Sequence, residues 1–174
     1  MNLTSEMNEL IKFLSKREDY VIFAGFGAFL YTGVECSKDI DIFVSSFESV
    51  KKITKLLKEK NWKQVKQETD NKYYSVAILE KNKTSLDIVY SVTSKDTLYP
   101  TKEKIKFQEY KLNVLSKESM LITKINQLTY IDRAKEKYKR DRQVINILRK
   151  EIDVKKLRKI LQKLHEVFWT FGRL

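Results

Sequence analysis

The sequence predicts an α/β (α+β) protein in which a mixed sheet flanked by helices is followed by a helical subdomain. In the first ~95 residues, segments with helical spacing of apolar residues alternate with short β-branched segments, a pattern typical of a sheet covered by helices. From Ser116 onward the apolar spacing is helical throughout. We therefore expect an α/β domain over residues 1–98, and a connection with a C-terminal helical subdomain over residues 99–174.

Local patterns define the elements of the first part. Met7, Leu10 and Leu14 recur at the spacing of one helix face, whereas the alternation in "DIDIFV" is that of a strand. Gly33 is placed to end a short helix as its C-cap. The polar turn "KNKT" joins the last two strands as a hairpin. Helices are expected over 4–17, 26–33 and 47–60, and strands over 20–24, 39–44, 62–68, 72–80 and 85–92.

The character of the chain changes after Asp96. The only proline, Pro100, lies in the expected connection, and residues 104–116 contain one or two short strand candidates. Helices are expected over about 116–129, 131–150 and 153–170. The last helix carries an apolar stripe that indicates core packing or, less often, a partner helix. The stripe consists of Val154, Leu157, Leu161, Leu164 and Phe168.

Composition narrows the classes of function. The net charge of +12 favours polyanions, although lysines spread over every segment fit a Lys-rich source equally well. The single cysteine, Cys36, the lack of an apolar leader and the lack of a membrane-length apolar run predict a cytoplasmic location away from membranes. One histidine, His165, lies between apolar helical positions and is expected to be structural. His/Cys zinc sites and Ser-His-Asp machinery are therefore excluded, which leaves carboxylates, lysines and oxygen-bound metal ions.

Two carboxylates follow the glycine-rich stretch. Residues i and i+2 of a strand share a face, so Asp39 and Asp41 project together while Ile40 points into the core. Adjacent carboxylates repel, and a divalent cation such as Mg²⁺ would relieve the repulsion, although exposed strands also carry alternating acids. Asp87 lies in a second apolar strand, and it completes a three-carboxylate cluster if the two strands are neighbours; the alternative is a strand-edge acid.

Small residues precede these acids. Gly25 and Gly27 end an expected strand and open a helix, where uncovered backbone N–H groups favour phosphate. A third glycine at the Rossmann spacing and a Gly-Lys-Ser/Thr motif are both missing. The informative feature is the order of strand, small-residue loop, short helix and strand with two acids.

In that order, "AGFGAFLYTGVECSKDIDIFV" resembles the signature of the nucleotidyltransferase superfamily related to DNA polymerase beta, and in particular its small prokaryotic members. The resemblance departs at Phe26, which stands at the usual second small position, with Gly27 one place late. Asp87 fits the third acid of that superfamily. The residues that carry the match are Gly25, Ala28, Gly33, Ser37, Asp39 and Asp41.

The second half resembles the C-terminal helices of AbiEii-type toxin nucleotidyltransferases. The match depends on Ser116, Lys124, Arg133 and Asp141. Lys117 replaces a usual proline, the usual Lys-Asp pair reads Arg-Asp, and Val144 replaces a second aspartate. The resemblance covers about residues 20–150, and it is more specific for the superfamily than for the toxin-like branch.

The resemblance implies transfer of a nucleoside monophosphate from a nucleoside triphosphate (NTP) to an acceptor hydroxyl, with release of pyrophosphate. It implies that Asp39, Asp41 and Asp87 bind Mg²⁺ or Mn²⁺, and that Asp87 takes the hydroxyl proton. Lys124 would neutralise the pyrophosphate and Asp141 would orient Lys124; the alternative is that Lys124 is a solvated lysine on a helix. The residues expected to contact phosphates are Gly25, Gly27, Ser37 and Lys38.

The sequence leaves three hypotheses about the function open. The toxin-like branch implies RNA, above all tRNA, or a protein as acceptor, and an antitoxin as a possible partner. The second hypothesis is an antibiotic-type small molecule, which the net charge of +12 disfavours if that molecule is a cation. The third is a non-catalytic basic binding module. The expected RNA face consists of the basic residues between Arg133 and Lys159, Arg140, Arg142 and Arg149 among them; the alternative is a merely solvated basic surface.

Overall fold

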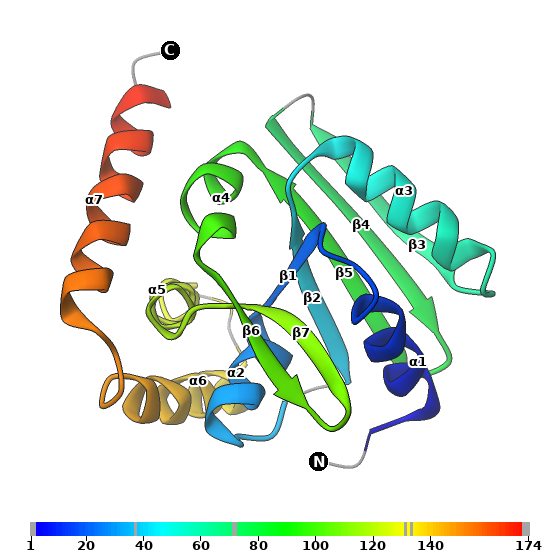
Figure 1. Cartoon of the computed structure of the whole chain (residues 1–174), viewed down its shortest axis with the longest axis horizontal. Coiled ribbons are helices and arrows are strands. Elements are labelled where there is room, and N and C mark those ends of the chain that lie inside the picture. Colours follow the sequence, from blue (N-terminus) through cyan, green and yellow to red (C-terminus); the bar gives the residue numbers. More distant parts are fainter. Residues whose placement is uncertain (1–2, 37, 71–72, 131, 133, 172–174) are drawn as a thin grey trace.

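The computed structural model describes residues 3–36, 38–70, 73–130, 132 and 134–171. Its strands are β1 Tyr20–Phe23, β2 Asp39–Val44, β3 Lys63–Asp70, β4 Tyr74–Lys81, β5 Thr84–Ser91, β6 Lys102–Phe107 and β7 Tyr110–Leu115. They form one seven-stranded sheet in the order β3-β4-β5-β2-β1-β7-β6 (Figure 1). The pairs β2–β5 and β1–β7 are parallel, and the other neighbours are antiparallel. The mixed α/β class predicted from the sequence is confirmed.

Helices α1 (Ser5–Leu14) and α3 (Phe47–Lys58) cover one face of this sheet. Both begin at a hydroxyl cap: the side chain of Thr4 accepts from the N–H of Met7, and that of Ser46 from the N–H of Ser49. Such caps satisfy N–H groups that lack partners inside the helix. The apolar face of α1 is fully buried in the core together with Ile40 of β2. The α1 and α3 face therefore holds much of the hydrophobic core.

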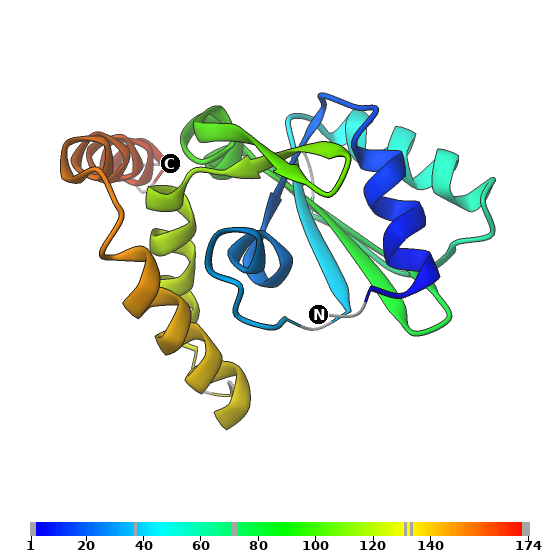
Figure 2. The ribbon, with the colours of Figure 1, turned by 60° about the horizontal axis from the view of Figure 1, so that its bottom comes forward.

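The remaining longer helices lie on the other side of β2. Figure 2 shows α2 (Ala24–Thr32) on the opposite side of β2 from α1, with α5 (Lys117–Gln127), α6 (Lys135–Leu148) and α7 (Val154–Phe171) beyond it. Gly33 ends α2 with φ of 68°, the left-handed C-cap that the sequence predicts. The alternation of β2 turns Asp39 and Asp41 toward this second side.

Two element boundaries differ from the sequence-based expectation. Helix α2 begins at Ala24 rather than residue 26, because the chain leaves the strand at Phe23, the N-cap residue. Residues 92–97 form the short helix α4 (Val92–Thr97). The sequence analysis placed Val92 at the end of a strand and assigned no element to the other residues of this segment. The side chain of Ser91 starts α4 by accepting from the N–H of Ser94, a local hydrogen bond that hydrophobic periodicity does not reveal.

The sheet continues beyond residue 98. After α4 and a single 3₁₀ turn (Tyr99–Thr101), β6 and β7 add to the sheet beside β1, and Ile22 pairs with Val114. The wholly helical part of the chain begins with α5. The division into domains near residue 98 therefore stays a prediction, and it separates strands that belong to one sheet.

Helix α7 is anchored to α5 at its first turn. Glu118, which is buried, accepts a hydrogen bond of 2.9 Å from the N–H of Asp153 and pairs with Lys156 at 3.2 Å. The expected apolar stripe of α7 is only partly covered, since Leu157 and Leu164 are half-buried whereas Val154 and Leu161 are exposed; the side chain of Phe168 lies outside the described part. Among the described residues, no helix combines the length and the apolar character needed to cross a bilayer.

Candidate active site

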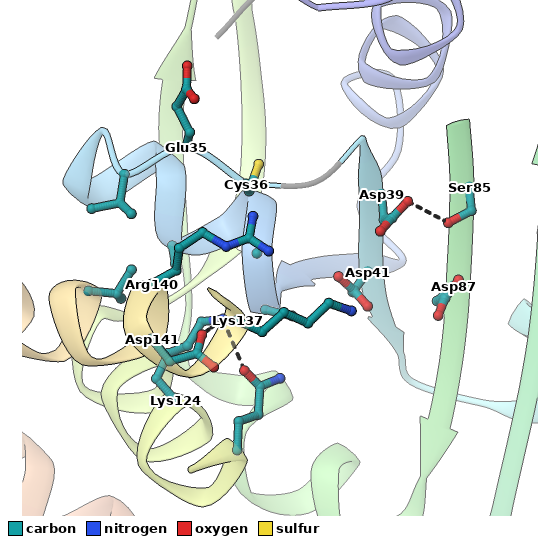
Figure 3. Close-up of a pocket in the computed structure, with 16 residues that line it drawn as sticks. Glu35, Cys36, Asp39, Asp41, Ser85, Asp87, Lys124, Lys137, Arg140 and Asp141 are labelled. Atoms are coloured by element: carbon teal, nitrogen blue, oxygen red, sulfur yellow. Dashed lines mark hydrogen bonds and ion pairs between the residues drawn. The ribbon is translucent and has the colours of Figure 1, made fainter. Parts of the chain in front are cut away.

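A cavity of about 260 Å³ lies where β2 and β5 meet the start of α2 and the facing sides of α5 and α6. The strands contribute Asp39, Asp41 and Asp87, and the helices contribute Gly25 and a set of cations (Figure 3). Lys124 and Asp141, which were also predicted from the sequence as site residues, line it too. The cavity therefore brings together segments from both halves of the chain.

The three aspartates share one face of neighbouring strands. Because β2 and β5 are parallel, Asp41 stands opposite Asp87 in the register, and Asp39 stands opposite Ser85. The hydroxyl of Ser85 donates a hydrogen bond of 3.1 Å to Asp39. Ile40, which lies between Asp39 and Asp41 in the sequence, is fully buried on the other face of the sheet. The strands of Asp41 and Asp87 are therefore neighbours, which is the condition under which Asp87 joins the other two aspartates in one cluster.

Burial and mutual repulsion disfavour the charged forms of these acids. Burial, then Asp87 and Asp39, raise the pKa of Asp41 to about 7, against smaller opposing effects of Lys124 and Lys137. Burial, then Asp39, also raise the pKa of Asp87. Carboxylates that repel each other inside a partly closed cavity are stabilised by a nearby cation. The site therefore has an unmet requirement for positive charge.

This requirement suits a divalent cation. All the donors on the two strands are hard oxygen ligands, as Mg²⁺ and Mn²⁺ prefer. Among the residues that the structure describes, no three acidic, histidine or cysteine side chains already have the arrangement of a metal site. The donor set fits such an ion in chemistry and charge, and Asp39, Asp41 and Asp87 are the residues that would hold it.

The raised pKa of Asp41 predicts a pH-dependent stability. In the folded chain this pKa is about 7 instead of 3.8, so the stabilising proton is fully retained below the unfolded pKa and lost as pH rises toward 7. Asp41→Asn mimics the protonated form, and its advantage in melting temperature over the parent should grow between about pH 5 and pH 8. Thermal melting in metal-free buffer measures this difference. A difference that stays constant with pH would contradict the assigned electrostatics.

The start of α2 forms one wall of the cavity. Ala24 and Gly25 line it, and Ala24 has φ of 53°, a left-handed conformation that non-glycine residues adopt rarely. The N-cap residue Phe23 provides no side-chain hydrogen bond to the first turn. The first N–H groups of α2 therefore lack a side-chain cap, at a helix end that favours anions.

Gly27 has a packing role and does not line the cavity. A Cβ atom at Gly27 would lie 2.5 Å from Cε of Met120 and 3.3 Å from the carbonyl oxygen of Ile22. Its lack of a side chain allows α2 to approach β1 and α5 closely. The expected phosphate contact is displaced because α2 starts two residues earlier than predicted, which leaves Gly25 at the helix start.

Substitution of Gly27 tests this packing role. Gly27→Val should destabilise the protein by about 1–3 kcal/mol, because the added methyl groups overpack a site already in contact with Met120. Denaturant unfolding measures the loss, and Gly27→Val with Met120→Ala should recover part of it. If Gly27→Val unfolds at the same denaturant concentration as the parent, the close approach of the two helices is wrong.

A buried ion pair joins α5 to α6 at the cavity. Nζ of Lys124 lies 2.9 Å from Oδ1 of Asp141 and donates a 3.0 Å hydrogen bond to Gln127. The side chains of Lys124 and Asp141 are each only 5% exposed. The sequence-based pairing of these two residues is thus present, and it connects the two helices that form this side of the cavity.

No family model and no curated protein matches the sequence. The solution structure of the antibiotic-resistance factor ANT(2'')-Ia matches with a TM-score of 0.63 at 10% identity, over 97% of this chain and 94% of that chain. An antigenic nucleotidyltransferase-like protein from Paracoccidioides brasiliensis matches with a TM-score of 0.56 at 16% identity, over 99% and 92% of the two chains. The chain has a nucleotidyltransferase fold.

Within this nucleotidyltransferase fold, two expected phosphate contacts are not seen in the cavity. Lys38 is exposed and does not line it, and Ser37 lies outside the described residues, as does Arg133. His165 is exposed on α7 and likewise does not line the cavity.

The cavity also contains residues that the sequence-based site lacked. Lys137 and Arg140 reach it from α6, and Cys36 lies at its edge, where burial raises the pKa of the thiol to about 11. The sequence already indicated that Lys137 and Arg140 share one side of a helix with Asp141 and Val144. Residues 137, 140, 141 and 144 recur at intervals that place them on one face of a helix.

Proposed function

We propose that this protein transfers a nucleoside monophosphate from an NTP to an acceptor hydroxyl and releases pyrophosphate. The observation that carries the proposal is the meeting of Asp39, Asp41 and Asp87 in one cavity with the uncapped start of α2 and with cations on the opposite wall. Phosphoryl-type transfer depends on positioning and charge stabilisation, and this arrangement offers both. The shared fold with nucleotidyltransferases supports the same reaction class.

Each residue of the site has a role in this proposal. Asp39, Asp41 and Asp87 would hold a divalent cation, which would neutralise phosphate charge. The acceptor oxygen attacks the α phosphorus, the bond from that phosphorus to the bridging oxygen of the β phosphate breaks, and pyrophosphate leaves. Asp87 takes the proton of the acceptor hydroxyl, since a carboxylate placed beside the attacking oxygen can act as a general base. Backbone N–H groups near Gly25 contact the phosphates.

RNA is the acceptor that the surface of α6 supports best. Away from the cavity, Tyr138, Lys139, Arg142 and Lys150 line a shallow depression of about 790 Å³ on this helix. Cations with an exposed aromatic ring suit a nucleic-acid backbone and its bases. Arg140, which was expected on the same RNA face, instead lines the cavity, because it lies three residues after Lys137 and four before Val144, both of which line the cavity from one side of α6. Resemblance to toxin-like nucleotidyltransferases supports the same acceptor class.

A small-molecule acceptor is the second candidate. ANT(2'')-Ia, which matches this chain with a TM-score of 0.61 in a second structure, has been crystallised with adenylyl-2''-tobramycin. A cationic acceptor of that kind would face Lys137 and Arg140 at the cavity here. We therefore rank it below RNA.

Transfer of a labelled nucleotide distinguishes the acceptors. Each NTP, labelled on the α phosphate, is incubated with the protein in separate reactions that contain total RNA, cell protein or an aminoglycoside panel. We expect labelled RNA at low salt and a steep loss between roughly 50 and 200 mM salt. Lys139→Glu with Arg142→Glu should remove RNA labelling and leave NTP binding unchanged. Label on an aminoglycoside alone would identify the second candidate, and no label on any acceptor would contradict the proposed function.

A further inference from the structure

Two cations of α6 face the carboxylates across the cavity. Lys137 and Arg140 are three residues apart, so they occupy one side of α6, and both line the cavity. Figure 3 shows Lys137 extending from α6 toward Asp41, with Arg140 beside it below Cys36. The positive charge of Lys137 acts across the cavity, since it lowers the pKa values of both Asp41 and Asp87 against the larger effects that raise them.

These cations differ from Lys124, the lysine singled out by the sequence. Lys124 is buried, and its charge is already matched by Asp141 at 2.9 Å. By contrast, within the described part of the chain neither Lys137 nor Arg140 makes a side-chain hydrogen bond or an ion pair. Lys137 is exposed and Arg140 half-buried, so both can reach a ligand without losing a partner. An anion that enters the cavity therefore meets these two side chains as available donors.

The direction of the reaction favours α6 as the side of the leaving group. In transfer from a triphosphate, the attacking and leaving oxygens lie roughly in line on opposite sides of the α phosphorus. Asp87, the proposed base, lies on β5, and Asp41 lies between it and α6 (Figure 3). If the acceptor oxygen is next to Asp87, the β and γ phosphates extend toward Lys137 and Arg140.

We propose that Lys137 and Arg140 bind the β and γ phosphates of the NTP and the pyrophosphate that leaves. This inference rests on the proposed function. Arg140 offers a planar fork suited to two phosphate oxygens, and Lys137 supplies a compact charge. Lys124 and Asp141 then serve as the tether that positions α6, and the leaving group is contacted by Lys137 and Arg140, to which the sequence analysis gave no role toward the triphosphate.

Binding of inorganic tripolyphosphate, measured by calorimetry with Mg²⁺ present, tests this inference without any transfer. Lys137→Gln with Arg140→Gln should weaken binding by at least about tenfold per residue, the typical effect of losing a charged hydrogen bond. Arg158→Gln with Lys159→Gln removes the same two residue types from exposed positions on α7 and should change affinity less than about twofold. Arg140→Lys should weaken binding less than Arg140→Gln, since it keeps the charge.

The outcomes separate this inference from the proposed function. Tripolyphosphate binding that depends on Lys137 and Arg140 supports the inference even if the protein transfers no nucleotide. The lack of transfer would contradict only the proposed function. Equal binding by the α6 and α7 double variants would overturn the inference, even in a protein that transfers nucleotides. Absence of tripolyphosphate binding to the parent protein would overturn it as well. Matching melting temperatures confirm that both double variants are folded.

Discussion

Asp41→Asn is expected to lower nucleotidyl transfer by about a thousandfold, because cation-based stabilisation of phosphate charge contributes several kcal/mol and each 1.36 kcal/mol is tenfold in rate. Asp41 pairs in register with Asp87 and is repelled by both other aspartates of the site. Asparagine keeps the shape of the side chain and removes that repulsion, so the variant should melt at or above the temperature of the parent. Single-turnover transfer and thermal melting measure the two effects.

Two further variants control for this result. Asp96→Asn makes the same chemical change at an exposed position of α4 and should transfer at the parental rate. Ile40→Asp places an unpaired charge on the fully buried face of the same strand and should unfold the protein. Parental transfer by Asp41→Asn would show that the carboxylates of β2 are not the site.

The largest effect on stability is expected at the tether between α5 and α6. Asp141→Asn leaves the ammonium of Lys124 buried without its 2.9 Å carboxylate partner. Breaking a buried ion pair in this way costs about 3–5 kcal/mol. Equilibrium unfolding in urea, with the same slope assumed for parent and variant, measures this loss.

The double variant Lys124→Met, Asp141→Leu should recover most of the lost stability, since it leaves no buried charge uncompensated. Lys117→Met, which breaks the more exposed pair with Glu151, should cost no more than about 1 kcal/mol. If Asp141→Asn unfolds no more readily than Lys117→Met, the Lys124 pair is not buried as the structure has it.

The elements of the fold were predictable where local physics determines them. Hydrophobic periodicity identifies α1, α3 and the long C-terminal helices, and the C-cap geometry of Gly33 follows from its position after an apolar helix. The alternation around Ile40 also placed both aspartates of β2 on one face. The six-residue α4 escaped prediction because it is too short to show a period and begins at a serine cap.

The site was less predictable, because it depends on contacts between distant segments. Asp87 joins the other aspartates only because β5 pairs in parallel with β2, and no local pattern specifies that register. Gly27 was expected at phosphate, but the two-residue shift in the start of α2 moved it against Met120. Lys137 and Arg140 belonged to a long basic run, and only the packing of α6 shows which of its cations face the cavity.

The fate of labelled phosphate tests the central claim most directly. Parallel reactions contain the parent protein, the labelled acceptor fraction and an NTP labelled on either the α or the γ phosphate. Nucleotidyl transfer predicts that the α label enters the acceptor and that the γ label appears as pyrophosphate, both in proportion to the protein and both abolished by Asp41→Asn. Transfer of the γ label to the acceptor, or release of the γ label as orthophosphate without modification of the acceptor, would contradict the account.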